Sequence, residues 1–436
     1  MKGIKELTIL GIVVLFGMSW YSLFNNSKAA QTEYDNYIKT ARMKAEMEIV
    51  TDAEENYMKA LNLHESIELR SEIAEFYRDS NQEYALEDWS EGMITKYPYE
   101  PEGYEFLAFY YKGEEQYYDC YTILNQAKKR RVSSKTLDSL DNELAYAYEI
   151  EWANYTDKTV FSSGYCAVAS ESGKWGYINT AGITVVPYGY RAGKPFTASG
   201  FAPVQSETGE YFLINSQGDK KYVDVEKKNI QDSGPLSEDR MAVLIDGRYQ
   251  YADIEFKKLF GDYDYAGTFL NGVAAVKENN RWSIIDKDGK QIGTDTYEDI
   301  KLDGRGYAFQ NGVAFVKKNG AYSLIDTTGK PVGENTWEDA HVFGSDMTSV
   351  KKNGKWGYID KTGEIVIEPQ YENARTFSNE LAAVSINGKW GYINTGNKVV
   401  IEPVFNEAEE FTTSGSAFIK DDIGWKLLKL YRLNKE

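Results

Sequence analysis

The sequence predicts an α+β multidomain protein with an N-terminal transmembrane helix, an α-helical solenoid and an all-β repeat array. Three observations lead to this prediction. Residues 7–24 carry no charge, a helix-patterned stretch repeats itself after 34 residues, and one short phrase recurs eight times in a strand-patterned stretch. We therefore divide the 436 residues into domains 1–30, 31–158 and 159–436.

The apolar run Leu7–Phe24 has 18 residues, close to the roughly 20 that a helix needs to cross a bilayer. Lys2 and Lys5 precede it and favour a cytoplasmic N-terminus. This predicts a single-pass membrane protein whose bulk lies on the extracytoplasmic side. The alternatives are a signal peptide with Ser27 and Ala29 before the cut, which would make the protein secreted, and a buried core helix.

In residues 31–158 apolar residues recur at three- and four-residue steps, which indicates amphipathic helices. The 34-residue repeat is carried by the pairs Ile73 and Leu107, Ala74 and Ala108, and Tyr77 and Tyr111. This pattern resembles the tetratricopeptide repeat, in which 34 residues form two antiparallel helices. The early Trp of that family is only partly kept. By the same resemblance, Leu144, Ala145 and Tyr148 fit the first helix of a terminal cap.

The resemblance implies a concave surface built from the first helix of each pair. The residues expected there are Glu68, Glu75, Arg78, Glu102, Glu105 and Phe109. Residues 31–158 contain 14 Lys and Arg against 28 Asp and Glu, so such a groove would favour a basic or C-terminally extended peptide segment. The alternative is that these side chains are merely exposed and that the helices form a rigid spacer.

The recurring phrase of residues 159–436 reads GKWGYIN at 173–179 and again at 388–394. Its central aromatic residue, the anchor of each unit, is Trp175, Tyr211, Tyr249, Trp282, Tyr322, Trp356, Trp390 and Trp425. The spacings are 36, 38, 33, 40, 34, 34 and 35 residues. Such regularity indicates that each anchor packs inside its own unit.

Each unit is expected to hold three strands. In seven units an Asp or Asn lies four residues after the anchor, and in five a Gly lies seven after it, which suits a type I turn between strands. One unit cannot bury its own apolar face, so neighbouring units must pack together. A propeller-like ring is favoured because closure removes exposed strand edges, and an open β spiral is the alternative.

The phrase KWGYI followed by Asp or Asn resembles the WG repeat family, a bacterial β-repeat. Tyr211, Tyr249 and Tyr322 depart from it, which makes the middle units weaker copies. The resemblance implies an all-β repeat array and supplies no catalytic residue.

The chain offers few residues for catalysis or metal binding. Cys120 and Cys166 are the only cysteines and His64 and His341 the only histidines, so neither a disulfide framework nor a histidine cluster can be assembled. The segment DKDG at 286–289 falls on the common turn, and no Glu follows at the distance that a calcium loop requires. We predict no catalytic residue, no cofactor and no metal site.

The sequence therefore predicts a non-catalytic, membrane-tethered scaffold that binds a protein or peptide. A net charge of −18 argues against nucleic acid as the partner, because phosphates require clustered Lys and Arg. One alternative is a cell-wall or extracellular glycan bound by exposed aromatic residues of the β array. A cryptic hydrolase is a further alternative, with Asp262 and Asp264 or Glu409 and Glu410 as its carboxylate pair.

Overall fold

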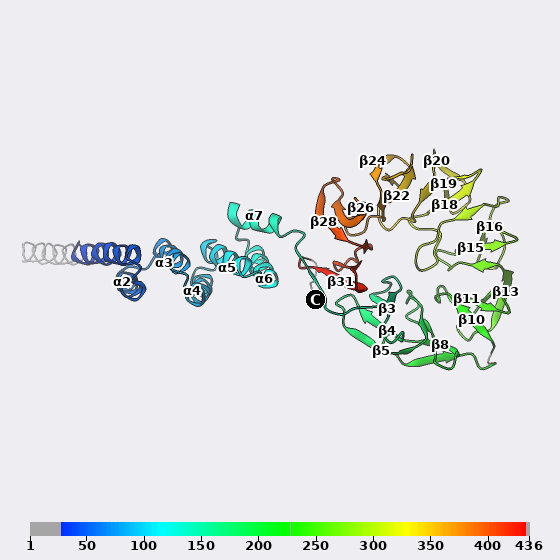
Figure 1. Cartoon of the computed structure of the whole chain (residues 1–436), viewed down its shortest axis with the longest axis horizontal. Helices are drawn as coiled ribbons and strands as arrows, with labels where there is room; N and C mark the ends of the chain where they lie inside the picture. Colours follow the sequence, from blue (N-terminus) through cyan, green and yellow to red (C-terminus); the bar gives the residue numbers. More distant parts are fainter. Residues whose placement is uncertain (1–27, 227, 433–436) are drawn as a thin grey trace, which may run out of the picture. The chain divides into compact units, whose positions relative to one another are not determined.

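The computed structural model describes residues 28–226 and 228–432 and divides the chain into two compact units. The first unit ends at Ala145 and is helical, and the second begins at Tyr146 and is built of strands (Figure 1). The sequence placed this boundary at residue 158. Residues 146–158 contain only two short strands, which are too brief to produce a β pattern.

The first unit is a succession of helices joined by short turns. A helix over residues 28–46 is followed by α2 (Val50–Leu63), α3 (Ile67–Asp79), α4 (Glu83–Lys96), α5 (Glu102–Gly113), α6 (Tyr117–Lys129) and α7 (Lys135–Glu143). Ser66 and Ser134 begin α3 and α7, since each side chain accepts a hydrogen bond from a backbone N–H of the first turn.

The positions that repeat after 34 residues form the core between these helices. Ala74 is fully buried, as is its counterpart 34 residues later, which allows neighbouring helices to approach closely. Tyr77 donates a hydrogen bond to Glu54 at 2.8 Å, and Tyr111 donates the equivalent bond to Glu87 at 3.0 Å. A similar contact thus recurs between α5 and α4 as between α3 and α2, with the acceptor shifted by one residue.

The last predicted helix ends earlier than the sequence suggested. α7 ends at Glu143, and Tyr148, which fitted a helical cap, instead begins strand β1 (Tyr148–Ile150). Its partner is Leu430 near the other end of the second unit. This sheet pairing overrides the local helical periodicity, a weak preference that tertiary contacts often reverse.

The predicted transmembrane helix and single-pass localisation are corrected by the structure. In residues 28–226 and 228–432 no helix is long and apolar enough to cross a membrane. Helices α2 to α7 have 9 to 14 residues and the helix over 28–46 is rich in charged residues, whereas a span needs about 20 mostly apolar residues. The segment Leu7–Phe24 lies outside the described residues.

The described strands of the second unit form eight sheets, the blades of a β-propeller (Figure 1). Blades 1 to 4 are β2 (Asp157–Lys158), β3 (Tyr165–Ala169), β4 (Trp175–Asn179) and β5 (Thr184–Tyr190); β6 (Ala192–Gly193), β7 (Ala202–Gln205), β8 (Tyr211–Ile214) and β9 (Lys220–Val223); β10 (Ile230–Ser233), β11 (Met241–Ile245), β12 (Arg248–Ala252) and β13 (Lys258–Tyr263); and β14 (Tyr265–Ala266), β15 (Val273–Glu278) and β16 (Arg281–Asp286).

Blades 5 to 8 follow the same order. They are β17 (Asp299–Ile300), β18 (Val313–Lys318), β19 (Ala321–Asp326) and β20 (Pro331–Trp337); β21 (Asp339–Ala340), β22 (Met347–Lys352), β23 (Lys355–Asp360) and β24 (Ile365–Tyr371); β25 (Asn373–Ala374), β26 (Leu381–Ile386), β27 (Lys389–Asn394) and β28 (Val399–Phe405); and β29 (Glu407–Ala408), β30 (Ser416–Lys420) and β31 (Trp425–Leu430), with β1 as the fourth strand.

Strand β1 closes the ring. It precedes blade 1 in the chain, yet it pairs with β31 and occupies the outer position of blade 8. Lys429 of β31 forms ion pairs with Glu149 and Glu151, which fixes the register of this pairing. The unit is therefore the closed ring that the sequence favoured, and not the open spiral.

Seven of the eight blades have four strands where the sequence suggested three. The strand that was missed is the first one, often only two residues long, such as Asn373–Ala374. The fourth strand lies at the periphery (Figure 1). Pro369 and Pro403 are in such outer strands, where a residue without an N–H breaks no ladder.

The glycine that follows the anchor is required by the pairing of the third and fourth strands. A Cβ at Gly391 would lie 2.5 Å from the carbonyl oxygen of Ile401, and one at Gly176 would lie 2.7 Å from that of Val186. No other residue fits there without moving the backbone. The glycine of the WG phrase is therefore required by a close approach of two strands.

Candidate functional site

A groove of about 630 Å³ lies on the helical unit. It is lined by Arg42, Ile67, Glu68, Ser71, Glu72, Glu75 and Glu102. These residues belong to the helix over 28–46, to α3 and to α5, which are the first helices of the successive pairs. The groove is thus formed by first helices, the elements from which the sequence predicted a concave surface.

Three of the six groove residues predicted from the sequence line this groove: Glu68, Glu75 and Glu102. The other three are not among its lining residues. Arg78 is exposed and its Nε donates to Asp79 at 3.0 Å, Glu105 accepts a hydrogen bond from Ser134, and Phe109 is exposed.

Sequence reasoning missed Glu72 and Arg42. Glu72 could have been found, because it lies four residues after Glu68 and three before Glu75, on the same helix face. Arg42 could not have been found, since the position of a side chain from the helix over 28–46 depends on how the helices pack.

Glu72 and Arg42 form a bidentate ion pair in the groove. Nε and Nη2 of Arg42 each lie 2.7 Å from a different oxygen of Glu72, and Tyr57 donates to the same carboxylate at 3.0 Å. The hydrogen bond from Arg42 holds the pKa of Glu72 below its ordinary value. The positive charge of Arg42 is therefore already neutralised within the groove.

The remaining acids of the groove have no ion-pair partner among residues 28–226 and 228–432: they are Glu68, Glu75 and Glu102. Hydrogen bonding to its own backbone N–H and to Ser66 lowers the pKa of Glu68, so its carboxylate is ionised at neutral pH. Oxygen Oε2 of Glu102 is buried without a hydrogen-bond partner. The groove consequently presents unbalanced negative charge.

The eight anchors occupy the start of the third strand of each blade. Six are buried, with 4% to 9% of their surface exposed: Tyr211, Trp282, Tyr322, Trp356, Trp390 and Trp425. Trp175 and Tyr249 are half-buried.

A second aromatic position, two residues after the anchor, was not singled out in the sequence. Its tyrosine hydroxyl donates to a backbone carbonyl of the next blade: Tyr177 to Lys194 at 2.9 Å, Tyr251 to Gly267 at 2.8 Å, Tyr358 to Arg375 at 3.0 Å and Tyr392 to Glu409 at 2.9 Å. The repeated Y of KWGY was the available signal. The hydrogen bond of this tyrosine joins consecutive blades.

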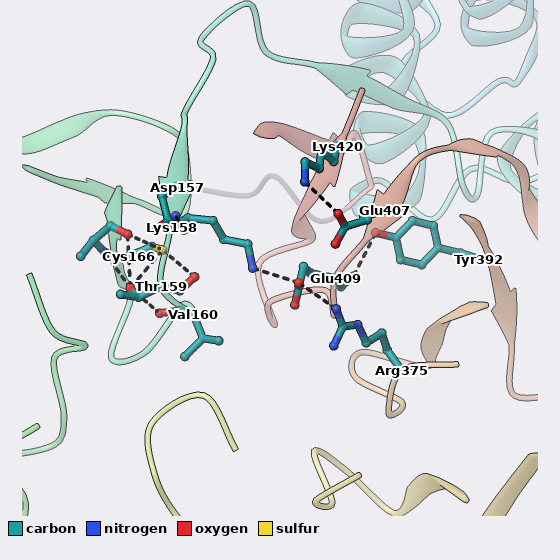
Figure 2. A network of polar contacts seen from close by, with 11 residues as sticks. Asp157, Lys158, Thr159, Val160, Cys166, Arg375, Tyr392, Glu407, Glu409 and Lys420 are labelled. Carbon is teal, nitrogen blue, oxygen red and sulfur yellow. Dashed lines mark hydrogen bonds and ion pairs between the residues drawn. The ribbon is translucent and has the colours of Figure 1, made fainter. Parts of the chain in front are cut away.

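Figure 2 shows a polar cluster where blades 7, 8 and 1 meet. Lys158 of β2 occupies the position held by Ala374 in blade 7, and its Nζ lies 3.0 Å from Glu409 and 4.5 Å from the ring centre of Trp425. Arg375 reaches the same carboxylate at 3.1 Å. Glu409 thus bridges two cations across both interfaces of blade 8.

Five stretches of the chain match the family described as WG containing repeat. They are residues 175–207, 261–282, 322–356, 356–390 and 390–422. The second unit contains WG repeats. Four of these matches begin at an anchor, so a WG repeat runs from the third strand of one blade to the second strand of the next. The Tyr211 and Tyr249 anchors begin no match, whereas Tyr322 does.

Several solved structures give more distant similarities, and no curated protein matches the sequence. BamB from Moraxella catarrhalis is 13% identical over 65% of this chain and 100% of its own, with a TM-score of 0.46. Hsv2p of Kluyveromyces lactis is 10% identical (55% and 93% covered, TM-score 0.37), and the WD40 domain of SCAP from fission yeast 11% (65% and 98%, TM-score 0.39). We transfer no function from them.

Most of the side chains that could have served in catalysis are buried or packed against other side chains of the WG repeats or helices. Burial raises the pKa of Cys120 to about 11 and that of Cys166 to about 12, which keeps both as thiols. The ring of His341 stacks on Trp356 with centres 4.7 Å apart. Within the described residues, no three His, Cys, Asp or Glu side chains are grouped to hold a metal ion.

Three of the four carboxylates of the candidate hydrolase pairs contact cations. Asp262 lies 2.8 Å from Nε of Arg248, which also contacts Asp264. Contact with Arg248 lowers the pKa of Asp262. Glu409 is engaged by Lys158 and Arg375, as described above. In the adjacent Glu410, burial and the charge of Glu409 raise the pKa.

Proposed function

We propose that this chain is a non-catalytic binding protein whose helical groove docks a basic segment of a partner protein. The observation that carries the proposal is the groove itself, with three acids that lack a cation and one buried carboxylate oxygen that lacks a donor. Ile67 adds an apolar surface between them. A Lys or Arg of a bound segment would supply the missing charge and donor, and this gain favours binding.

The absence of catalysis in this proposal is supported by what the reactive side chains do. Both cysteines are buried with raised pKa values, and His341 is stacked on its anchor. Glu409 of the polar cluster in Figure 2 binds cations of both neighbouring blades. These contacts are those of a scaffold, in which charged groups position elements.

The test is chemical crosslinking in intact cells, followed by affinity recovery of the full chain. A triple variant, Glu68→Gln, Glu75→Gln and Glu102→Gln, is compared with the unchanged chain. We expect recovery of a reproducible protein partner to fall at least about tenfold, because each neutralised acid removes an attraction to a basic segment. Binding by the unchanged chain should also weaken as salt increases.

The matched control replaces Glu46, Glu91 and Glu114 with Gln; these three are exposed acids of helices or helix ends and do not line the groove. It removes the same total charge and should leave recovery unchanged. If both triple variants lose the partner equally, general charge is responsible and the groove proposal fails. If both retain it, the partner binds elsewhere and the proposal fails as well.

A second candidate function is glycan binding by the propeller, which one observation favours. Blade 4 carries a hollow of about 390 Å³ lined by Asp264, Tyr265, Lys277, Asn280 and Trp282. Aromatic faces beside polar side chains suit a sugar ring. If insoluble peptidoglycan co-purifies in the same experiment in place of a protein, and Tyr265→Ala abolishes its retention, this candidate takes the place of the first.

A further inference from the structure

The interval between the anchors Trp282 and Tyr322 is 40 residues, six more than the intervals of 34 that follow it. The extra residues lie after the first strand of blade 5, β17 (Asp299–Ile300), and before the second, β18. We call residues 302–307 the strap loop. It connects the first strand of blade 5 to the second.

The strap loop is folded around Asp303. One oxygen of its carboxylate accepts hydrogen bonds from the backbone N–H groups of Arg305 and Tyr307, at 2.8 and 3.0 Å. The other accepts from the guanidinium of Arg305 at 2.6 and 2.9 Å. Gln310 donates to the same oxygen at 3.2 Å. Because the acid is so fully bonded, the loop has a fixed shape.

The strap loop leaves its own blade and contacts three others. Thr268 of blade 4 donates from its backbone N–H to Gly306 at 2.8 Å and from its hydroxyl to Arg305 at 2.7 Å. The hydroxyl of Tyr307 lies 3.3 Å from that of Ser237 in blade 3.

The third contact is with blade 1, on the opposite side of the ring. A Cβ added to Gly304 would overlap with Cγ1 of Val160, so the side chain of Val160 packs directly against the backbone of Gly304. Blades 1 and 5 are four blades apart in either direction around the ring. The strap loop therefore spans its centre.

Val160 lies beside the seam where the ring closes. Two residues earlier is Lys158, which contacts Glu409 and Trp425 of blade 8. Blade 8 is also where β1 pairs with β31. We propose that the strap loop couples blade 5 to this seam, so that closure of the ring by β1 depends on a contact made from its opposite side.

The test is hydrogen exchange in the full chain, followed at the amides of Tyr148–Ile150 and Trp425–Leu430. Gly304→Ala is the first variant. The backbone of Gly304 is not in the left-handed region, so the added methyl group acts only by colliding with Val160. We expect exchange at the β1–β31 pair to accelerate roughly tenfold, since overpacking of this size opens well-packed contacts.

A second substitution provides the rescue. Val160→Ala in the Gly304→Ala background makes room for the added methyl group and should return exchange at the β1–β31 pair toward its original rate. The control is Gly189→Ala, on the outer strand of blade 1, where an added Cβ meets nothing within 4 Å. It should leave these amides unchanged.

Two results would overturn the proposal. One is acceleration confined to residues 265–326 of blades 4 and 5, which would mean that the loop serves its own region alone. The other is acceleration at the β1–β31 pair that persists after Val160→Ala, because the effect would then not pass through that contact.

Discussion

His341 is a side chain whose protonation is set by the assembly of the propeller. Burial, together with the positive charge of Arg375, lowers its pKa from an ordinary 6.5 to about 4. The unfolded chain therefore binds more protons than the folded one between these values. The free energy of unfolding should consequently fall as the pH falls from about 6.5 to about 4, by as much as about 3 kcal/mol.

The measurement is chemical unfolding of the full chain and of His341→Asn at pH 7 and pH 4. The unchanged chain should lose more stability on acidification than the variant does. Glu410, whose raised pKa acts in the opposite direction, is present in both proteins and cancels in the comparison. An equal loss in both would show that His341 is not the group responsible.

At the scale of the element, the strand pair β27 and β28 depends on the glycine of the WG phrase. Gly391→Ala would place a methyl group 2.5 Å from the carbonyl oxygen of Ile401, and backbone at this distance cannot give way as a flexible side chain can. We expect a loss of about 2–3 kcal/mol, seen as a fall of several degrees in the melting temperature. Gly189→Ala, which meets open space, is the control. Equal melting temperatures for the two variants would contradict this account.

The elements that the sequence predicted well are those with a period. The 34-residue spacing located the helix pairs, and the anchors located the third strand of each blade, because both patterns repeat over many residues. The two-residue first strands were not predicted, since two residues have no period. β1 was mistaken for helix, because only its distant partner, β31, makes it a strand.

The candidate groove was predicted in part for a similar reason. Glu68, Glu75 and Glu102 follow from their places on first helices, whereas Arg42 is brought to Glu72 by packing between helices. The length of the strap loop was visible as the interval of 40 residues. The blades that the loop contacts were not visible in the sequence, because the contact between Gly304 and Val160 exists only once the eight blades have closed.

At the scale of the whole molecule, the first strand of the second unit, β1, belongs to its last blade. A chain that starts at Thr159, the boundary expected from the sequence, lacks β1 and Lys158. Strand β31 would then be an exposed edge that carries Leu428 and Leu430, a site for aggregation. A chain that starts at Tyr146 keeps both features.

We therefore expect residues 146–436 to elute as a compact monomer on size-exclusion chromatography and to unfold in one cooperative transition. Residues 159–436 should aggregate or melt at a markedly lower temperature, because blade 8 has lost its outer strand and Glu409 has lost one of its two cations. If the two behave alike, closure by β1 does not determine the stability of the ring, and the seven other interfaces between blades suffice to hold it.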